Sequence, residues 1–243
     1  MNETTAPGPN DWFARLLEKY LGDLSNFFWD AFTALKFNGI SGDYVEFGSS
    51  GAKSLSSAYH VLAAMGAERR LWAFDSFEGL PPAASDHDEH PVWGAGGQFT
   101  SWSGRPPEGM DPAEAGLAQF HADCAQFGVP REAYTPVPGW FEDSLGALGA
   151  SGDPVDIALA YVDCNMHSST LTVFEFLEPR LKHGMVLAFD DYHMWTSSDV
   201  SGQRRALHDF AAAHPEWRFV PFKEVHWGAR SFVVENGALL SGS

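Results

Sequence analysis

Three aspartates are the residues of this sequence whose positions point most directly to chemistry. Asp163 follows the apolar run 157–162, and Asp190 and Asp191 follow the apolar run 185–189. Parallel strands finish on the same edge of a sheet, so two parallel strands here would bring the three carboxylates together. Gathered carboxylates repel one another, and their pKa values rise unless a cation neutralises them. Because Mg²⁺ prefers oxygen ligands and keeps water that a substrate oxygen can replace, we predict that Asp163, Asp190 and Asp191 bind it.

The same region supports two other interpretations. Asp190 and Asp191 would act only as caps if their oxygens accepted hydrogen bonds from loop amides. Nearby histidines, first His167 and His193 and then His90, would serve as a general base, because neutral imidazole is well populated at pH 7. Asp163 is a further candidate for that base. The candidate catalytic residues are Asp163, His167 and His193.

A glycine turn and an acid point to a bound nucleoside. Residues 46–51 (EFGSSG) follow a short strand candidate and precede a helical stretch, and their glycines allow the backbone to turn sharply beside a ligand. Asp75 follows the next strand candidate, where a carboxylate can accept hydrogen bonds from both ribose hydroxyls. Residues 139–141 follow the third strand candidate and offer aromatic rings that would stack on an adenine. Each motif also has a purely structural interpretation. The glycines would then only form a turn, Asp75 would cap a helix, and the aromatic rings of 139–141 would pack in the core.

Seven strand candidates alternate with helical stretches along the chain. They lie at residues 44–47, 70–74, 133–137, 157–162, 185–189, 218–222 and 231–234. This alternation predicts an α/β sandwich with a mainly parallel seven-stranded sheet covered on both faces. The last two candidates are joined by a segment too short for a helix, which predicts a hairpin and one antiparallel strand at the sheet edge.

The remaining segments should surround this sheet. Residues 1–40 are expected to form a tail and a helical cap, with one helix starting at Asp11 and a second over 23–37. Exposed aromatic residues on that cap would favour a homodimer. Residues 41–243 are expected to form one α/β unit with an insertion at about 81–110, where periodicity is absent and a lid is expected. The aromatic residues of the insertion are Trp93, Phe99 and Trp102.

Composition excludes several classes of partner. The 243 residues include 15 Lys and Arg against 32 Asp and Glu, a formal charge of −17 that repels nucleic acid and anionic membranes. The start of the chain lacks the basic residues and apolar run of a secretory signal, and no stretch reaches the roughly 20 apolar residues of a membrane helix. Two cysteines do not make a disulfide framework. We therefore expect a cytoplasmic protein with a small-molecule partner.

These motifs together resemble a known family. They are residues 45–48 (VEFG), 74–81 (FDSFEGLP), 139–145 (GWFEDSL), 161–163 (YVD), 189–192 (FDDY) and 202–206 (GQRRA). In this order they are similar to the TylF-like O-methyltransferases of macrolide and aminocoumarin sugars, and the likeness covers roughly residues 40–235. The resemblance implies a Rossmann-like class I methyltransferase fold, S-adenosylmethionine as the methyl donor, and a divalent cation.

The resemblance also assigns residues. It implies donor contacts for Glu46, Gly48, Ser50, Gly51, Ser54, Asp75, Ser76, Phe77, Gly139, Trp140, Phe141 and Asp163. One departure concerns the metal: the family pattern Asp-x-Asp-x-Tyr-Glu-Ser-Thr is replaced by the segment 163–170 (DCNMHSST). Asn165 keeps an oxygen but removes a charge, and His167 and Ser168 stand in place of tyrosine and glutamate.

The resulting expectation is an S-adenosylmethionine-dependent O-methyltransferase, assisted by a divalent cation, that acts on a hydroxyl of a natural-product sugar or phenol. Two alternatives stay open: a metal-independent methyltransferase with a histidine base, and a protein that binds S-adenosylmethionine without catalysis. A nicotinamide oxidoreductase is less consistent with the sequence, because it would normally show three glycines in the turn and would have no use for Asp190 and Asp191.

Overall fold

The computed structural model describes residues 9–95 and 109–240. The helices are α1 (Pro9–Phe37), α2 (Lys53–Ala64), α3 (Pro112–Gln126), α4 (Phe141–Leu148), α5 (His167–Leu177) and α6 (Gly202–Ala213). The strands are β1 (Asp43–Phe47), β2 (Leu71–Asp75), β3 (Tyr134–Pro138), β4 (Ile157–Val162), β5 (Val186–Phe189), β6 (Trp217–Glu224) and β7 (Arg230–Asn236). No described helix is both long and apolar enough to cross a bilayer.

The seven strands form one sheet in the order β3-β2-β1-β4-β5-β7-β6. Strands β1 to β5 pair in parallel, whereas β7 is antiparallel to both β5 and β6. The predicted mainly parallel sandwich and its terminal hairpin are therefore confirmed. The strand that runs against the others is β7, one place inside the edge strand β6. Since Phe189 pairs with Arg230, the tip of the β6–β7 hairpin lies at the carboxyl end of β5.

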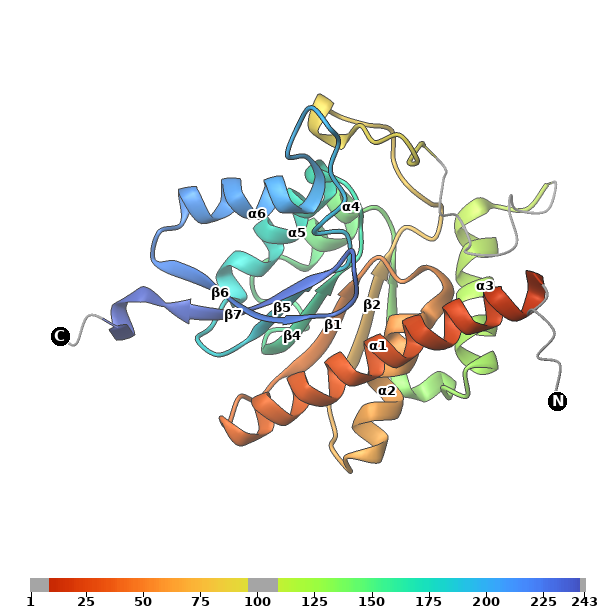
Figure 1. Cartoon of the computed structure of the whole chain (residues 1–243), viewed down its shortest axis with the longest axis horizontal. Helices are drawn as coiled ribbons and strands as arrows, with labels where there is room; N and C mark the ends of the chain where they lie inside the picture. Colours follow the sequence, from red (N-terminus) through yellow and green to blue (C-terminus); the bar gives the residue numbers. More distant parts are fainter. Residues whose placement is uncertain (1–8, 96–108, 241–243) are drawn as a thin grey trace, which may run out of the picture.

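Helices cover both faces of the sheet (Figure 1). Helices α1, α2 and α3 share one hydrophobic cluster with one face, and α4, α5 and α6 share a second cluster with the other. Neighbouring side chains of the central strands alternate between the two clusters: Leu159 and Tyr161 belong to the first, and Ala160 and Val162 to the second. Burial on both faces explains why these strands read as continuous apolar runs.

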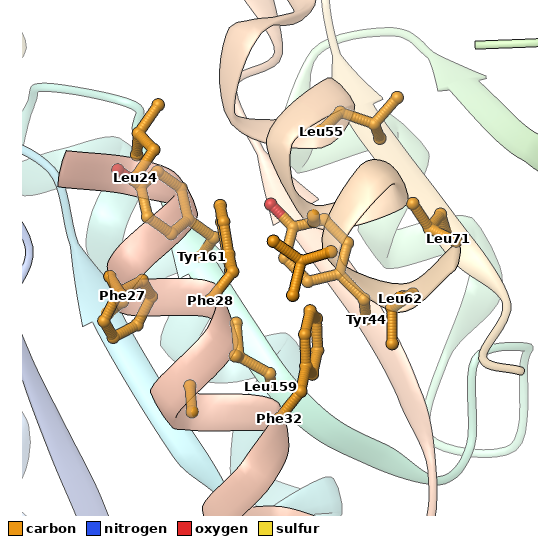
Figure 2. Packing of buried hydrophobic residues seen from close by; sticks show 14 of the residues in the cluster. Leu24, Phe27, Phe28, Phe32, Tyr44, Leu55, Leu62, Leu71, Leu159 and Tyr161 are labelled. Atoms are coloured by element: carbon orange, nitrogen blue, oxygen red, sulfur yellow. The ribbon is translucent and has the colours of Figure 1, made fainter. Parts of the chain in front are cut away.

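The expected pair of N-terminal helices is wrong, because residues 9–37 form one continuous helix. Gly22 lies at the expected break, but an isolated glycine costs a helix only about 1 kcal/mol. Burial of the three phenylalanines that follow, each contributing about 1.5–3 kcal/mol, outweighs that cost. These are Phe27, Phe28 and Phe32, all at most 2% exposed, which pack on Tyr44 and Tyr161 of the sheet (Figure 2).

The expectation of exposed aromatic residues on this segment holds for part of α1. Among the side chains described from residue 14 onward, Phe27, Phe28 and Phe32 of α1 lie in the chain's own core, whereas Trp29 and Phe37 are exposed. The expected lid is only partly described: the loop 81–95 leads into residues 96–108, so Phe99 and Trp102 lie outside the described residues, as does the tail 1–8. In Figure 1 the yellow loop 81–95 lies beside the blue loop that precedes α6.

Candidate active site

A cavity of about 530 Å³, here called the central cavity, lies at the carboxyl ends of the parallel strands. Gly48 and Asp75, with Ser50, line what we call its glycine-turn end, and the three aspartates of the predicted metal site line what we call its carboxylate end. The two groups that the sequence placed on one rim of the sheet therefore face a single space. Its size is that of a pocket for one drug-sized ligand, within the usual range of roughly 300–1,000 Å³.

Only glycine can occupy position 48. Its φ is +88°, and a Cβ added there would lie 2.0 Å from the backbone oxygen of Asp163. The Gly48 amide donates to the Phe74 carbonyl over 2.8 Å, so the chain turns tightly between β2 and β4. This close approach exposes backbone of the glycine turn to the cavity where a side chain would otherwise stand.

Asp75 is fixed by the backbone around it. One carboxylate oxygen accepts from the Ser49 amide and the other from the Phe77 amide, each over 2.7 Å. Burial raises the pKa of Asp75, and these two amide hydrogen bonds lower it. A carboxylate has about four acceptor positions, so each oxygen can still accept a hydroxyl from a ligand in the cavity.

Next to the glycine turn, two buried oxygens have no hydrogen-bond partner. They are Oε1 of Glu46 and Oγ of Ser49. The other Glu46 oxygen accepts from the Tyr44 hydroxyl. Burial raises the pKa of Glu46 to about 7, and the nearby hydroxyls of Tyr44, Ser54 and Ser49 lower it, although the Ser49 contact falls short of regular hydrogen-bond geometry. Neither residue lines the central cavity, so these two oxygens lie behind the glycine turn.

The predicted donor residues fall into three groups by the cavity that they line. Ser50, Ser54, Ser76, Trp140 and Phe141 line the central cavity. Gly51 and Phe77 instead line a small hollow beside α3, while Glu46 and Gly139 adjoin the central cavity without lining it. The backbone of Phe77 is left-handed, with φ of +57°, and its ring packs on Phe120 at 5.3 Å. The Phe77 amide donates a hydrogen bond to Asp75, but the Phe77 side chain belongs to the core.

The three aspartates of the carboxylate end meet closely. Each of Asp163, Asp190 and Asp191 places an oxygen within 4.8 Å of the others, and Oδ2 of Asp191 is buried without a partner. Burial, followed by the charge of Asp190, raises the pKa of both Asp163 and Asp191 well above the ordinary range, while Lys53 lowers that of Asp163. An all-oxygen cluster with one buried oxygen left without a partner fits a hard divalent cation.

Asp190 has partners that the sequence did not reveal. Its Oδ1 accepts from the Tyr161 hydroxyl, from His226 Nε2 over 2.8 Å and from the Tyr20 hydroxyl over 3.5 Å. The Tyr20 and His226 rings are 5.2 Å apart. Helix α1 and the tip of the β6–β7 hairpin thus meet at one carboxylate oxygen, which leaves Oδ2 as the Asp190 oxygen available to a ligand.

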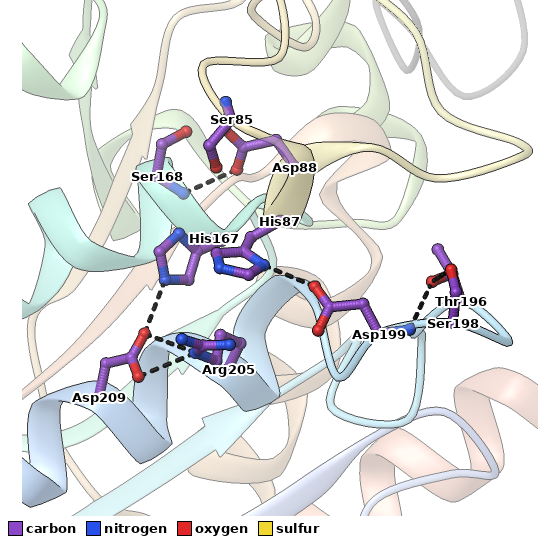
Figure 3. Close-up of polar contacts among 10 residues, drawn as sticks. All are labelled: Ser85, His87, Asp88, His167, Ser168, Thr196, Ser198, Asp199, Arg205 and Asp209. Carbon is purple, nitrogen blue, oxygen red and sulfur yellow. Dashed lines mark hydrogen bonds and ion pairs between the residues drawn. The ribbon is translucent and has the colours of Figure 1, made fainter.

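The predicted histidines do not line the central cavity. His167 begins α5, and its Nε2 bonds Asp209 of α6 over 3.1 Å (Figure 3). The His193 ring lies against Tyr192 and Trp195, and burial followed by the charge of Arg230 lowers its pKa. Closeness in sequence to the aspartates therefore did not bring either ring to them.

Asn165, where the family pattern has an aspartate, does line the central cavity. Its φ is +60°, in the left-handed region that asparagine tolerates better than most residues. Its backbone lowers the pKa of Asp191 by hydrogen bonding. The substitution therefore removes a charge beside the cluster while keeping the local backbone in reach of Asp191.

The sheet order, the glycine turn and the carboxylate rim define a class I S-adenosylmethionine-dependent methyltransferase fold. Residues 24–216 match the family described as Macrocin-O-methyltransferase (TylF), and the chain belongs to that family.

Two relatives extend the comparison by sequence. A tetracenomycin-C rhamnosyl 4'-O-methyltransferase of Streptomyces olivaceus is 31% identical over 71% of this chain and 59% of its own length. The mycinamicin III 3''-O-methyltransferase of Micromonospora griseorubida is 25% identical over 73% of this chain and 63% of its own length. The chain therefore spans about three fifths of the length of these relatives.

The crystal structure of the calicheamicin methyltransferase CalS11 shares the fold. It superposes with a TM-score of 0.63 at 21% sequence identity, and the alignment covers 95% of this chain and 87% of that one.

Proposed function

We propose that this protein is an S-adenosylmethionine-dependent O-methyltransferase that methylates a sugar hydroxyl of a natural product with the help of a divalent cation. The observation that supports this most is the single central cavity, which has a nucleoside-type seat at one end and three clustered carboxylates at the other. The two relatives, one named for a rhamnosyl-bearing tetracenomycin and the other for mycinamicin III, support the acceptor class.

At the glycine-turn end, Asp75 would accept the ribose hydroxyls and the exposed backbone around Gly48 would lie along the donor. Trp140 and Phe141 line the same cavity and would pack on the adenine. Methyl transfer is an in-line displacement, so holding donor and acceptor in line is the main task of these residues.

At the carboxylate end, Asp163, Asp190 and Asp191 would hold the cation. When bound, a divalent cation supplies Lewis-acid stabilisation to an acceptor oxygen. Asp163 directly follows β4, and its backbone oxygen lies beside Gly48. This residue of the carboxylate end therefore adjoins the glycine-turn end. With the charge of the cluster neutralised, Asp163 would be ionised and would accept the proton of the acceptor hydroxyl.

The test is methyl transfer from tritiated S-adenosylmethionine to methyl α-L-rhamnoside and to a simple catechol, with Mg²⁺ and with a chelator. Isothermal titration with S-adenosylhomocysteine measures donor binding separately. We expect product from the rhamnoside that depends on Mg²⁺. Turnover that is insensitive to chelator would remove the metal from the proposal, and donor binding without any transfer would favour a binding protein.

Two further proposals concern the protein's state in the cell. We propose a homodimer through α1, supported by the exposed Trp29 and Phe37 side chains, and light scattering on the purified protein tests it. We also propose a cytoplasmic location, supported by the buried free thiols of Cys124 and Cys164. Tagging the chain in a producing cell and fractionating that cell checks the location.

A further inference from the structure

A charged residue holds the loop 81–95 against the rest of the chain. Asp88 is 2% exposed, and it is the only buried residue within this loop. Aspartate is rarely buried without partners, because a carboxylate taken out of water loses its hydration. The loop is therefore anchored by a carboxylate and not by an apolar side chain.

Three backbone amides satisfy the Asp88 carboxylate. Oδ2 accepts from the amides of Ala84 over 2.9 Å and Ser85 over 3.2 Å, both in its own loop. Oδ1 accepts over 2.8 Å from the amide of Ser168, which lies 80 positions further along the chain (Figure 3). Asp88 thus closes a turn of the loop with one oxygen and binds α5 with the other.

Helix α5 has no side-chain cap of its own. Met166 occupies its N-cap position and makes no capping hydrogen bond. Ser168 is the second residue of the helix, and its amide is one of those that a helix start leaves for a capping oxygen. Asp88 supplies that oxygen, and its charge suits the positive end of the helix. The family pattern has glutamate at position 168, so in this chain the acid at this helix end comes from the loop instead.

A short ordered link joins this anchor to Trp93, which lines the central cavity. The Trp93 amide donates to the His90 carbonyl over 3.3 Å, and the two rings stack with centroids 4.0 Å apart. The Trp93 ring also lies 4.0 Å from the point where a side chain on Gly202 would begin. The next residue, Gln203, accepts from the Asp191 amide over 2.9 Å. Trp93 therefore stands at the carboxylate end of the cavity.

A second contact from the same turn is more exposed. His87 bonds Asp199 over 2.5 Å, and its ring packs on the His167 ring with centroids 5.2 Å apart. The His87 and Asp199 side chains are 32% and 33% exposed, so water competes for their contact. The bond from Ser168 to Asp88 is shielded from water, where a hydrogen bond is stronger, and it therefore contributes more to holding the loop.

We propose that Asp88 is a positioning residue for methyl transfer: by capping α5 from the loop, it fixes Trp93 as a wall of the central cavity. This inference rests on the proposed function and goes beyond it by giving a role to a residue that does not line that cavity. Displacement of Trp93 should weaken binding of the acceptor at the carboxylate end. The donor should bind as before, because Asp75 and the glycine turn lie at the other end.

Asp88→Ala and Asp86→Ala are a matched pair, since both remove one negative charge from the turn Asp86–Asp88 and Asp86 is exposed. With tritiated donor, Mg²⁺ and methyl α-L-rhamnoside, Asp88→Ala should raise KM for the rhamnoside roughly tenfold and change kcat by less than about twofold. Affinity for S-adenosylhomocysteine should stay at the wild-type level. Asp86→Ala should match the wild type throughout. A wild-type KM in Asp88→Ala would overturn the inference.

An acid returned to α5 separates positioning from helix stability. Loss of the cap in Asp88→Ala should lower the melting temperature by about 2–4 °C. In the double variant Asp88→Ala with Ser168→Glu, a carboxylate in the helix's own first turn should recover much of that loss. KM should remain raised, because this carboxylate does not hold the loop. Recovery of both quantities would show that Asp88 acts only on the stability of α5 and would overturn the positioning role.

Two further measurements follow the contact without turnover. The Ser168 amide should exchange its hydrogen about tenfold faster or more in Asp88→Ala than in the wild type. In protein labelled with 5-fluorotryptophan, the fluorine resonance of Trp93, assigned with Trp93→Phe, should move in Asp88→Ala and not in Asp86→Ala. An unmoved resonance would overturn this inference and leave the proposed function standing. If the wild type does not methylate the rhamnoside, the proposed function fails, and the resonance still decides whether Asp88 positions Trp93.

Discussion

The two ends of the central cavity are built in different ways. The glycine-turn end comes from the ends of β1 and β2 and the turns that follow them, and backbone amides fix the carboxylate of Asp75. The carboxylate end gathers side chains from β4, β5, the β6–β7 hairpin and α1 around Asp190. One end is local and made largely of backbone, and the other is assembled from distant side chains. Substitutions at one end should therefore spare the ligand of the other.

Asp191→Ala should give the largest difference between an effect on methyl transfer and an effect on donor binding. Losing a cation ligand should reduce methyl transfer about 1,000-fold, equivalent to several kcal/mol of transition-state stabilisation. Donor binding, measured by titration with S-adenosylhomocysteine, should be unchanged because Asp191 lies at the other end. The melting temperature should change little, since the variant removes a buried oxygen without a partner and the repulsion by Asp190 together with one hydrogen bond from the Asn165 backbone. A variant with wild-type turnover would end the metal hypothesis.

The reciprocal change is Asp75→Ala. We expect affinity for S-adenosylhomocysteine to weaken about 100-fold, because two hydrogen bonds to a charged group each contribute roughly 1.5–3 kcal/mol before partial compensation by water. Mn²⁺ binding, followed by electron paramagnetic resonance, should stay at the wild-type level. Asp75→Asn is the matched control, since it keeps one oxygen for the amides. Loss of Mn²⁺ binding in either variant would show that the two ends are not independent.

The buried carboxyl group of Glu46 should make the free energy of unfolding depend on pH. Burial raises its pKa from 4.5 to about 7, so the folded chain holds a proton that the unfolded chain has already lost. By linkage, this stability is full below pH 4.5 and is lost as the pH rises through 7. Urea unfolding without ligands at pH 5.5 and pH 8 should differ by about 2 kcal/mol more in the wild type than in Glu46→Gln. An equal pH dependence in both would contradict the burial of an ionisable Glu46.

The smallest expected effect concerns His226, which comes from the β6–β7 hairpin and supports the carboxylate end from outside the cluster. His226 donates to Asp190, so removing it should loosen that carboxylate and weaken Mn²⁺ affinity about tenfold, the lower end of the range for residues behind a metal ligand. His226→Gln, which can place an amide nitrogen where Nε2 stood, should recover most of the affinity lost in His226→Ala. Donor affinity should be the same in both. Equal Mn²⁺ affinity in all three proteins would reduce His226 to a packing residue.

The sequence predicted those parts of the fold and site that short-range pattern determines. Alternation of apolar strands and helices was sufficient for the sheet, and a residue that closes a parallel strand is placed on the rim by topology alone. Gly48, Asp75 and Asp163 are of this kind, and all three line the central cavity. Their roles toward a donor and a cation stay predictions until the variants above are measured.

The remaining parts depend on contacts that short-range patterns do not encode. His226 reaches Asp190 because β7 pairs with β5 in a particular register, which apolar periodicity does not specify. His167 is close in sequence to Asp163, yet the start of α5 directs its ring to Asp209. The uninterrupted course of α1 through Gly22 is likewise decided by tertiary burial of Phe28 and its neighbours, which overrides a local break signal.

The meeting of Tyr20 with His226 has a consequence for biosynthesis of the chain. These residues stand about 200 positions apart, so their contact is among the slowest to form by loop closure. A ribosome-bound fragment that lacks the last hairpin can hold the glycine turn and Asp75 but cannot enclose Asp190. The carboxylate end is therefore completed only after the β6–β7 hairpin has left the ribosome, later than the glycine turn and Asp75 at the other end of the cavity.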